Sequence, residues 1–458
     1  MPRSRFFSVF ITASATAALV GCSTTATEQT HFYEEADALL NTENQRVFSP
    51  STSQAENASL TDLIPDSSLQ GLVHTALSGN PSLQKTALSL AASQLNLSNA
   101  RAARLPQANL GLSASDSETG DGQFSGNANI SWELDLWARL ADAQNAAEKS
   151  VASDYELFRA SQASLAGNVM KSWLQLIAHQ RAIDIEQQRL ALLETNESLI
   201  IKRFRNGLGT LESLDEAKTA TSQSRADLAQ YHEDLASELR ALRLLLGDNQ
   251  AAPIAIPEGY PNVLLTLQRL PNQDLALRPD LRAAYLSIEA ADYEVSVAYK
   301  DMLPSFDLSA SLSDASSSLR DALFVSPVWS LLGQLSTPVF QGGRLRANHE
   351  IAKLNMAQAY QDYRETLLNA VNEVEDAIGQ EAVLNKRQQH INSALQSAES
   401  NRQQYERKYR SGLVELSDLI SAQQAVFNLQ SELDTLQFQQ LSNRIELGLA
   451  LGLGIPQA

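Results

Sequence analysis

Residue types that proteins use for covalent, metal and nucleic-acid chemistry are scarce in this sequence. A single cysteine among 458 residues leaves no partner for an intramolecular disulfide or a Cys-based zinc site. The six histidines lie far apart, without H-x-x-x-H or H-E-x-x-H spacing. Lys and Arg number 35 against 53 Asp and Glu, and the net charge of −18 argues against nucleic-acid binding. We therefore expect neither an enzyme nor a resident metal or cofactor.

Helix-breaking residues and long apolar runs are also few. The chain has only 14 prolines and 20 glycines, so long uninterrupted helices are possible. Beyond the N-terminal segment no apolar run reaches roughly 18 residues, which predicts no transmembrane helix in the mature chain. Hydrophobic residues make up 43% and charged residues 19%, a composition that excludes a disordered protein.

The N-terminus has the features of a bacterial lipoprotein signal. Two arginines precede an apolar run at 6–20, which is too short to span a bilayer comfortably. The segment 19–22 reads LVGC, a lipobox, in which a peptidase cleaves before the cysteine and acyl chains are attached to it. Because Cys22 is the only cysteine, we expect a signal peptide at 1–21 and lipidation of Cys22. Several acyl chains give stable membrane anchoring.

Self-comparison shows that the rest of the chain is an internal repeat. Motifs of the first half recur in the same order in the second half, with one short insertion after the Leu-Pro pair. The matched segments are 80–83 with 278–281, 105–106 with 303–304, 139–140 with 344–345, 204–207 with 409–412 and 246–247 with 451–452. Each half is therefore expected to fold into the same series of elements.

Each half contains one very long predicted helix. The segments 138–205 and 343–410 contain no proline and one interior glycine each. A continuous helix of that length spans roughly 100 Å, at 1.5 Å per residue. Apolar residues with heptad spacing along both segments indicate coiled-coil packing. We expect 209–247 and 414–451 to be the partner helices that pack back along them.

Two hairpins of alternating apolar and polar residues precede the long helices, at about 107–134 and 305–336. In the first, Leu110 and Leu112 alternate with Asn109 and Ser113. Strands of about ten residues with one apolar and one polar face suit a membrane barrel, with lipid outside and water inside. The same alternation occurs on a sandwich face in a soluble domain, and that alternative stays open. Small residues and terminal aromatics favour the barrel.

Four strands from one chain cannot close a barrel, and open strand edges are not tolerated in lipid. Three chains would supply twelve strands, enough for closure. They would also supply twelve long helical elements, enough for a second, α-helical barrel. The outer surface of that helical tube would be polar, which places the helices in an aqueous compartment.

These features together resemble the TolC-like outer-membrane efflux factors, in particular the lipoprotein (NodT-type) branch that serves resistance-nodulation-division (RND) pumps. The resemblance covers about 60–455. It rests on the lipobox, the Leu-Pro before each hairpin, the segments 132–139 (WELDLWAR) and 338–344 (PVFQGGR), and the turns 204–207 and 409–412. It implies an α+β membrane protein, in which long helical hairpins form a periplasmic α-barrel and each chain gives four strands to a trimeric twelve-stranded outer-membrane β-barrel.

The resemblance also implies a function. The homotrimer would be the exit duct of a tripartite efflux system, docked on a periplasmic adaptor (membrane fusion protein) that links it to an inner-membrane RND transporter. It would passively conduct small molecules such as drugs to the exterior of a Gram-negative cell. Three alternatives stay open: a periplasmic coiled-coil scaffold without a pore, an exit duct for metal ions, and the duct of a type I protein secretion system.

The expected organisation follows the repeat. It comprises a signal peptide at 1–21, a lipid-anchored extended segment at 22–64, a first efflux repeat at 65–248, a linker at 249–263 and a second efflux repeat at 264–458.

Three sets of residues are candidates for function. The turns that end the long helices would form the adaptor-docking tip, with Arg205, Gly207, Leu208, Arg410, Gly412 and Leu413. Just beyond the second turn, Ser417, Asp418 and Ser421 would line the periplasmic aperture. A ring of three carboxylates from Asp418 would favour cations over anions. Trp132, Trp137 and Trp329 flank the strands and are expected at the membrane interface, with packing at the barrel–helix junction as the alternative.

Overall fold

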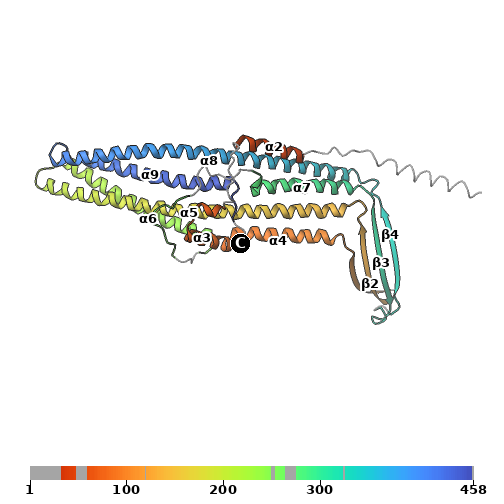
Figure 1. The fold of residues 1–458 in the computed structure, drawn as a ribbon. Coiled ribbons are helices and arrows are strands. Elements are labelled where there is room, and N and C mark those ends of the chain that lie inside the picture. Colours follow the sequence, from red (N-terminus) through yellow and green to blue (C-terminus); the bar gives the residue numbers. More distant parts are fainter. Residues whose placement is uncertain are drawn as a thin grey trace, which may run out of the picture.

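A computed structural model describes residues 32–47, 59–118, 120–248, 253–263, 275–322 and 325–455. The molecule is elongated: long helices run side by side, and a small sheet lies at one end (Figure 1). The predicted signal peptide and Cys22 lie outside the described residues. The helices are α2 (Phe32–Val47), α3 (Ser67–Gly79), α4 (Pro81–Ala102), α5 (Arg139–Arg205), α6 (Leu211–Leu246), α7 (Pro279–Lys300), α8 (Arg344–Arg410) and α9 (Leu416–Ala450), with short 3-10 turns at Leu60–Leu63 and Leu275–Leu277; the strands are β1 (Gln107–Ser117), β2 (Gly120–Leu134), β3 (Ser305–Ser316) and β4 (Val328–Ser336).

Two helices of 67 residues each, α5 and α8, form the axis of the fold. Both run from the sheet to the opposite end of the molecule (Figure 1). In the half near the sheet, α5 lies beside α4 and α7, and α7 also contacts α8. In the far half, α5 pairs with α6 and α8 pairs with α9. The two long helical hairpins expected from the sequence are therefore present.

Both halves of the chain use the same backbone arrangement where short and long helices meet. α4 and α7 each begin with a proline at the first helical position, where the missing N–H has no helical partner to lose. α6 ends at Gly247 with φ +73°, and a Cβ there would lie 2.1 Å from the carbonyl oxygen of Gly79. Gly452 has φ +74°, and its Cβ would lie 3.0 Å from the backbone nitrogen of Arg278. Both positions require glycine.

The strands form one antiparallel sheet in the order β1-β2-β3-β4. In its centre Trp132 pairs with Leu308 and Ala128 with Leu312. β1 continues to Ser117 and β2 begins at Gly120, so the connection between these two strands is tight. The connection between β3 and β4 is much longer, and the connection from β4 to α8 is also longer than that from β2 to α5, so the insertion in the second half is divided between them.

The main core lies where the helices of both halves converge near the middle of the molecule. Trp173 and Ile177 of α5 pack there with Val374 of α8 and Ile445 of α9, and all four are almost fully buried. A smaller apolar cluster joins the far ends of the two hairpins. Within the described residues, none of the helices combines the length and apolar character that a bilayer crossing requires.

The segment 22–64, expected to be irregular, contains a helix. α2 lies on α7 and α8 (Figure 1), with Phe32 stacked on Tyr360 at 4.8 Å between ring centroids. Ala36 is fully buried, and its carbonyl oxygen accepts a hydrogen bond from the Tyr363 hydroxyl at 3.4 Å. The expectation of an extended segment is wrong for this helix, because its apolar partners lie more than 300 residues away in the sequence.

Candidate channel surfaces

The sheet has one apolar and one polar face. Residues that pair in the register point to the same side, so each face joins alternate residues of all four strands. Large members of the apolar face are Leu110, Leu112, Ile130, Trp132, Leu308, Leu312, Trp329, Leu331 and Leu335. The opposite face is mainly polar and includes Asn109, Ser113, Ser125, Asn127, Asn129, Ser131, Ser309, Ser311 and Ser330, together with Val328 and Leu332 of β4.

The apolar face is exposed in the single chain. Figure 1 places the sheet at the end of the helical section, clear of the long helices, and Leu110, Leu331 and Leu335 are all exposed. A contiguous uncovered apolar surface marks contact with membrane or with another protein. On the polar face, the hydroxyls of Ser113 and Ser125 lie 2.7 Å apart, so part of that face satisfies its own hydrogen bonds. The two faces therefore suit two different solvents.

Two of the three tryptophans lie where the sheet meets the helices, and the third lies near the other end of the sheet. The indole Nε1 of Trp132 donates to the carbonyl oxygen of Arg104 at 3.0 Å, and that of Trp137 donates to Pro304 at 2.7 Å. Both acceptors lie in the turns that lead from α4 and α7 into a strand. Trp329 lies near the opposite end of β4 and is 75% exposed. Trp132 and Trp137 thus tie the sheet to the helices, while Trp329 lies free on the apolar face.

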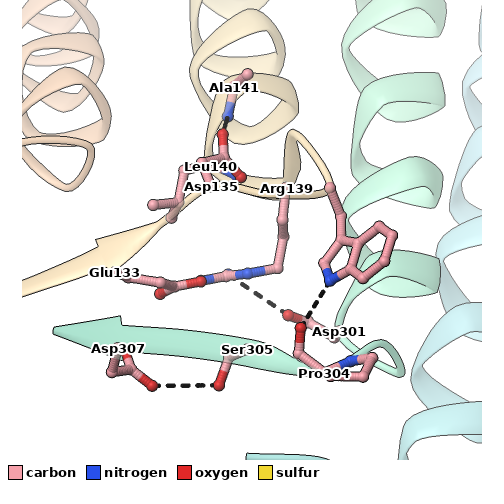
Figure 2. A network of polar contacts seen from close by, with 10 residues as sticks. Glu133, Asp135, Arg139, Leu140, Ala141, Asp301, Pro304, Ser305 and Asp307 are labelled. Atoms are coloured by element: carbon pink, nitrogen blue, oxygen red, sulfur yellow. Dashed lines mark hydrogen bonds and ion pairs between the residues drawn. The ribbon is translucent and has the colours of Figure 1, made fainter. Parts of the chain in front are cut away.

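A polar network joins the sheet to α5 and α7 (Figure 2). Arg139 Nη2 lies 2.8 Å from both carboxylate oxygens of Glu133, and Arg139 Nη1 lies 3.4 Å from Asp301 Oδ1. Asp135 accepts hydrogen bonds at 3.0 and 2.8 Å from two backbone N–H groups in the first turn of α5. No role for Glu133 or Asp135 was predicted from the sequence. Two acids just before a first-turn arginine were the available signal.

The equivalent junction before α8 is built differently. Val339 and Phe340 are 91% and 87% exposed. The backbone then turns at 342–343, two glycines with φ +61° and +85°. Arg344 donates to the side-chain oxygen of Gln341, and among the described residues it forms no ion pair.

The two predicted tip turns lie together at the end of the molecule opposite the sheet (Figure 1). Gly207 and Gly412 have φ +74° and +72° and end α5 and α8. The N–H groups of Leu208 and Leu413 each donate into the last turn of the preceding helix at 2.9 Å. Both leucine side chains are exposed. The remaining tip residues, Arg205 and Arg410, are exposed in the same turns.

The predicted aperture residues share one exposed side of the first turns of α9. Ser417, Asp418 and Ser421 are all exposed, whereas Leu416 and Leu419 between them are buried. Asp418 also accepts a hydrogen bond from the Glu415 backbone N–H at 3.1 Å, which completes a capping box. The same carboxylate therefore starts the helix and faces solvent.

Side chains that bind metals are not gathered anywhere in the described part of the chain: no three His, Cys, Asp or Glu residues form a suitable group there. Met170 and Met356 are buried in the main core. Within the described ranges, the ion pairs lie within single helices, as for Arg402 and Glu399, or join neighbouring elements, as for Lys149 and Glu289.

Known proteins resemble this chain in sequence and in fold. CusC, a "cation efflux system protein" of Escherichia coli O6:H1, is 28% identical over 412 residues, covering 88% of this chain and 89% of CusC. TtgF, a "toluene efflux pump outer membrane protein" of Pseudomonas putida, is 28% identical over 409 residues, covering 85% of this chain and 84% of TtgF. The crystal structure of the Campylobacter jejuni CmeC outer membrane channel has the same fold, with a TM-score of 0.82 at 20% identity over 90% of this chain and 91% of CmeC.

The sequence profile of the family described as "Outer membrane efflux protein" matches residues 72–248 and 270–453, which is most of both halves. This agrees with the resemblance seen in the sequence, with the mainly helical fold and its small antiparallel sheet, and with placement in the outer membrane. The chain belongs to the outer membrane efflux protein family.

Proposed function

We propose that three copies of the chain close into one continuous exit duct. The observation that carries this proposal is the sheet, which is apolar on one face and polar on the other. Within the described residues its edge strands β1 and β4 each pair on one side only. Pairing β4 of one copy with β1 of the next, around a three-fold axis, gives twelve strands without an open edge. The apolar face then meets lipid and the polar face lines a water-filled lumen.

Exposed apolar side chains on the helices support the same assembly. Near the sheet the helices lie in the order α4-α5-α7-α8, so α4 and α8 are the outer members. α4 exposes Leu88 and Leu95, seven residues apart, and α8 exposes Ile351 and Leu354. When β4 meets β1 of the next copy, these two helices also meet. Burial of their exposed stripes adds about 25 cal/mol for each Å² of apolar surface removed from water.

The tip is proposed to dock a periplasmic adaptor that links the duct to an inner-membrane RND transporter. The two turns that end α5 and α8 present exposed Leu208 and Leu413 at the extremity of the molecule. Each turn is fixed by a left-handed glycine and by hydrogen bonds into its helix. A rigid, apolar projection of this kind suits recognition by a partner helix pair. Beside it, exposed Asp418 of three copies would form the aperture ring, flanked by Ser417 and Ser421.

The cargo is proposed to be small organic molecules, with the energy supplied by the partner pump. A relay for soft metal ions needs accessible thiolates, thioethers or imidazoles. Met170 and Met356 lie in the core, so these two of the four methionines cannot line a tunnel. The polar sheet face carries hydroxyl and amide side chains, which pass varied solutes without binding them tightly. Lipidation of Cys22 would hold the trimer at the membrane from the periplasmic side.

The assembly is tested by cryo-EM of the lipidated protein purified in detergent. We expect a three-fold tube with a helical section of roughly 100 Å, from 1.5 Å per residue, below a short detergent belt. A monomer, or an extended rod without a belt, contradicts the duct and leaves the pore-free scaffold in its place.

The cargo is tested by deleting the gene from its own host. We expect greater sensitivity to organic dyes, solvents and antibiotics, restored by the full-length gene. Sensitivity confined to silver or copper ions would contradict the organic cargo and favour a metal exit duct. Loss of a secreted protein as the sole effect would favour a type I secretion duct.

A further inference from the structure

The connection from β4 to α8 exposes apolar and cationic side chains together. Val339 and Phe340 have the highest exposed fractions of any large apolar residue in the described chain. Arg344 and Arg346 follow in the first turn of α8, and both are exposed. Among the described residues neither arginine forms an ion pair, and the first turn of α8 contains no acidic residue. Arg344 donates to the neutral side chain of Gln341, so within the described chain the positive charges of the connection have no counter-ion.

The matching junction in the first half shows that the fold does not require this arrangement. There the first-turn arginine, Arg139, is neutralised by Glu133 and Asp301 (Figure 2). The segment 328–343, which covers β4 and the connection to α8, contains no acidic residue that could take the place of Glu133 and Asp135. The second junction thus keeps the arginine without the two carboxylates.

The electrostatics at the start of α8 favour an anion. The N-terminus of a helix is the positive end of its dipole, where acidic residues are stabilising and cations are not. α8 is capped by Gly343, which has no side chain to accept from the first N–H groups. Arg344 and Arg346 add two positive charges in a protein whose net charge is −18. An external anion would satisfy both the N–H groups and the arginines.

The position of the β4–α8 connection, next to the apolar face of the sheet, indicates which kind of anion it suits. Val339 and Phe340 follow Leu335, the last residue of β4 on the apolar face of the sheet. Moving from the sheet toward the periplasmic helices, the surface is first apolar and then cationic. A phospholipid has the same order, from acyl chains to a phosphate headgroup, and basic groups next to an apolar membrane surface attract anionic lipids.

We propose that the β4–α8 connection binds anionic phospholipid from the inner leaflet of the outer membrane. Acyl chains pack on Val339 and Phe340, and the phosphate is held by Arg344 and Arg346. The site lies beside the edge strand, so each chain carries one. It rests on the outer-membrane placement of the sheet and not on the cargo or the adaptor. In the proposed trimer it lies next to the contact that β4 and α8 make with the next copy.

The test is native mass spectrometry of the full-length protein in detergent, titrated with dioleoyl phosphatidylglycerol or dioleoyl phosphatidylethanolamine. We expect preferential binding of phosphatidylglycerol. The variant with Arg344→Gln and Arg346→Gln should bind it roughly five-fold more weakly for each charge removed. Phosphatidylethanolamine has the same phosphate but no net charge, so its binding should weaken less. Arg205→Gln, which removes an exposed arginine at the opposite end of the molecule, is the matched control and should change neither.

A second variant separates the apolar part of the site. Val339→Ser with Phe340→Ser should weaken binding of both lipids alike, because it removes packing and not charge. The proposal is overturned if phosphatidylglycerol binding survives loss of both arginines, or if Arg205→Gln lowers it equally. It is also overturned if the arginine variant loses its oligomeric state along with its lipid, since the arginines would then join subunits. A wild-type monomer that still prefers phosphatidylglycerol would contradict the duct alone.

Discussion

At the residue scale, two glycines with the same left-handed backbone conformation have different structural roles in this chain. Gly247 brings the end of α6 against the end of α3, with backbone atoms so close that any Cβ would overlap them. Gly207 at the tip has nearly the same φ, but nothing lies within 4 Å of the position a Cβ would take. The first glycine is required for packing and for backbone conformation, the second for conformation alone.

Substitution of these two glycines separates the two effects. Gly207→Ala should lower the free energy of unfolding by about 1 kcal/mol, the cost of a left-handed non-glycine residue. Gly247→Ala should lower it by about 1–3 kcal/mol more, the range for an overpacked site. Thermal unfolding in detergent, followed by circular dichroism, gives the comparison. Equal losses for the two variants would show that the contact with Gly79 can relax.

At the scale of elements, buried polar groups fix α9 against α8. Glu381 of α8 is buried, and its Oε1 accepts from Arg444 Nη2 at 2.8 Å and from Gln440 Nε2 at 3.1 Å, both on α9. Asn443 of α9 donates to the carbonyl oxygen of Ala377 at 2.9 Å. Apolar packing alone would allow one helix to slide along the other, whereas these contacts specify one register.

Replacing Arg444 alone should destabilise the protein more than replacing both Arg444 and Glu381. Arg444→Met leaves the Glu381 carboxylate buried without its cation, and we expect a loss of about 3–5 kcal/mol in the free energy of unfolding. The double variant with Glu381→Met should recover part of that loss, because no unpaired charge remains. A double variant less stable than Arg444→Met would mean that the polar network itself supplies most of the stability.

The docking of α2 depends on a carboxyl group of α7. The Tyr33 hydroxyl donates to Asp292. Burial raises the pKa of Asp292 above its usual 3.8; the hydrogen bond from Tyr33 opposes the rise and the charge of Asp142 adds to it. A carboxyl whose pKa is higher in the folded state binds its proton more tightly there. Its contribution to stability is therefore lost as the pH rises from 3.8 through the raised pKa.

Asp292→Asn should remove this pH dependence, since the amide oxygen still accepts from Tyr33 but carries no charge. We expect the variant and the native protein to have similar thermal midpoints near pH 4. As the pH approaches 8, the midpoint of the variant should become the higher of the two. Asp292→Ala, which lacks the acceptor, should be less stable than the asparagine variant at every pH. An advantage of the asparagine variant that is largest at acid pH would contradict the assignment.

At the scale of the whole molecule, side chains join the two long hairpins along their length. Lys171 of α5 lies 3.3 Å from Glu446 of α9, and Arg189 donates to Asn428 at 2.9 Å. The apolar cluster at the far end contains residues of both hairpins. The tip turns and the start of α9 are therefore held in one relative position, which sets where an aperture ring would form.

In the proposed trimer, Asp418→Ala should change ion conduction more than stability. Removing three negative charges from one ring should raise single-channel conductance or abolish its dependence on divalent cations. Planar-bilayer recordings at several salt concentrations give the measurement. Asp418→Asn keeps an acceptor for the Glu415 N–H and so separates the charge from the helix cap. Conductance unchanged in both variants would remove Asp418 from the aperture.

Adaptor docking should depend on the leucines of the tip. Leu413→Glu places a charge on the exposed turn, and we expect the trimer to form normally while resistance in the host is lost. Leu244→Glu is the matched control, because Leu244 is as exposed as Leu413 but lies near the middle of the molecule. Resistance that survives Leu413→Glu, or is lost equally with Leu244→Glu, would place adaptor binding elsewhere.

The sequence alone determined most elements of this protein, with α2 as the exception. Local patterns are enough for that: the period of apolar residues distinguishes strands from helices, and the near absence of proline allows helices of 67 residues. Glycines and Leu-Pro pairs marked the boundaries of elements. The internal repeat then predicted the elements of the second half from those of the first. The exposed positions of Leu413 and Asp418 followed from the same helix boundaries.

Only the tertiary structure decided which distant residues meet. The helix α2 was not predicted, because it packs on Tyr360 and Tyr363, which lie far along the chain. Contacts of that kind leave no periodic pattern of apolar residues in the local sequence. The pairing of Arg139 with Asp301 was missed for the same reason, since the two residues come from different halves. The contrast with Arg344 appears only when the two junctions are compared in space. Local physics chooses helix or strand, whereas burial and charge pairing depend on neighbours that the fold supplies.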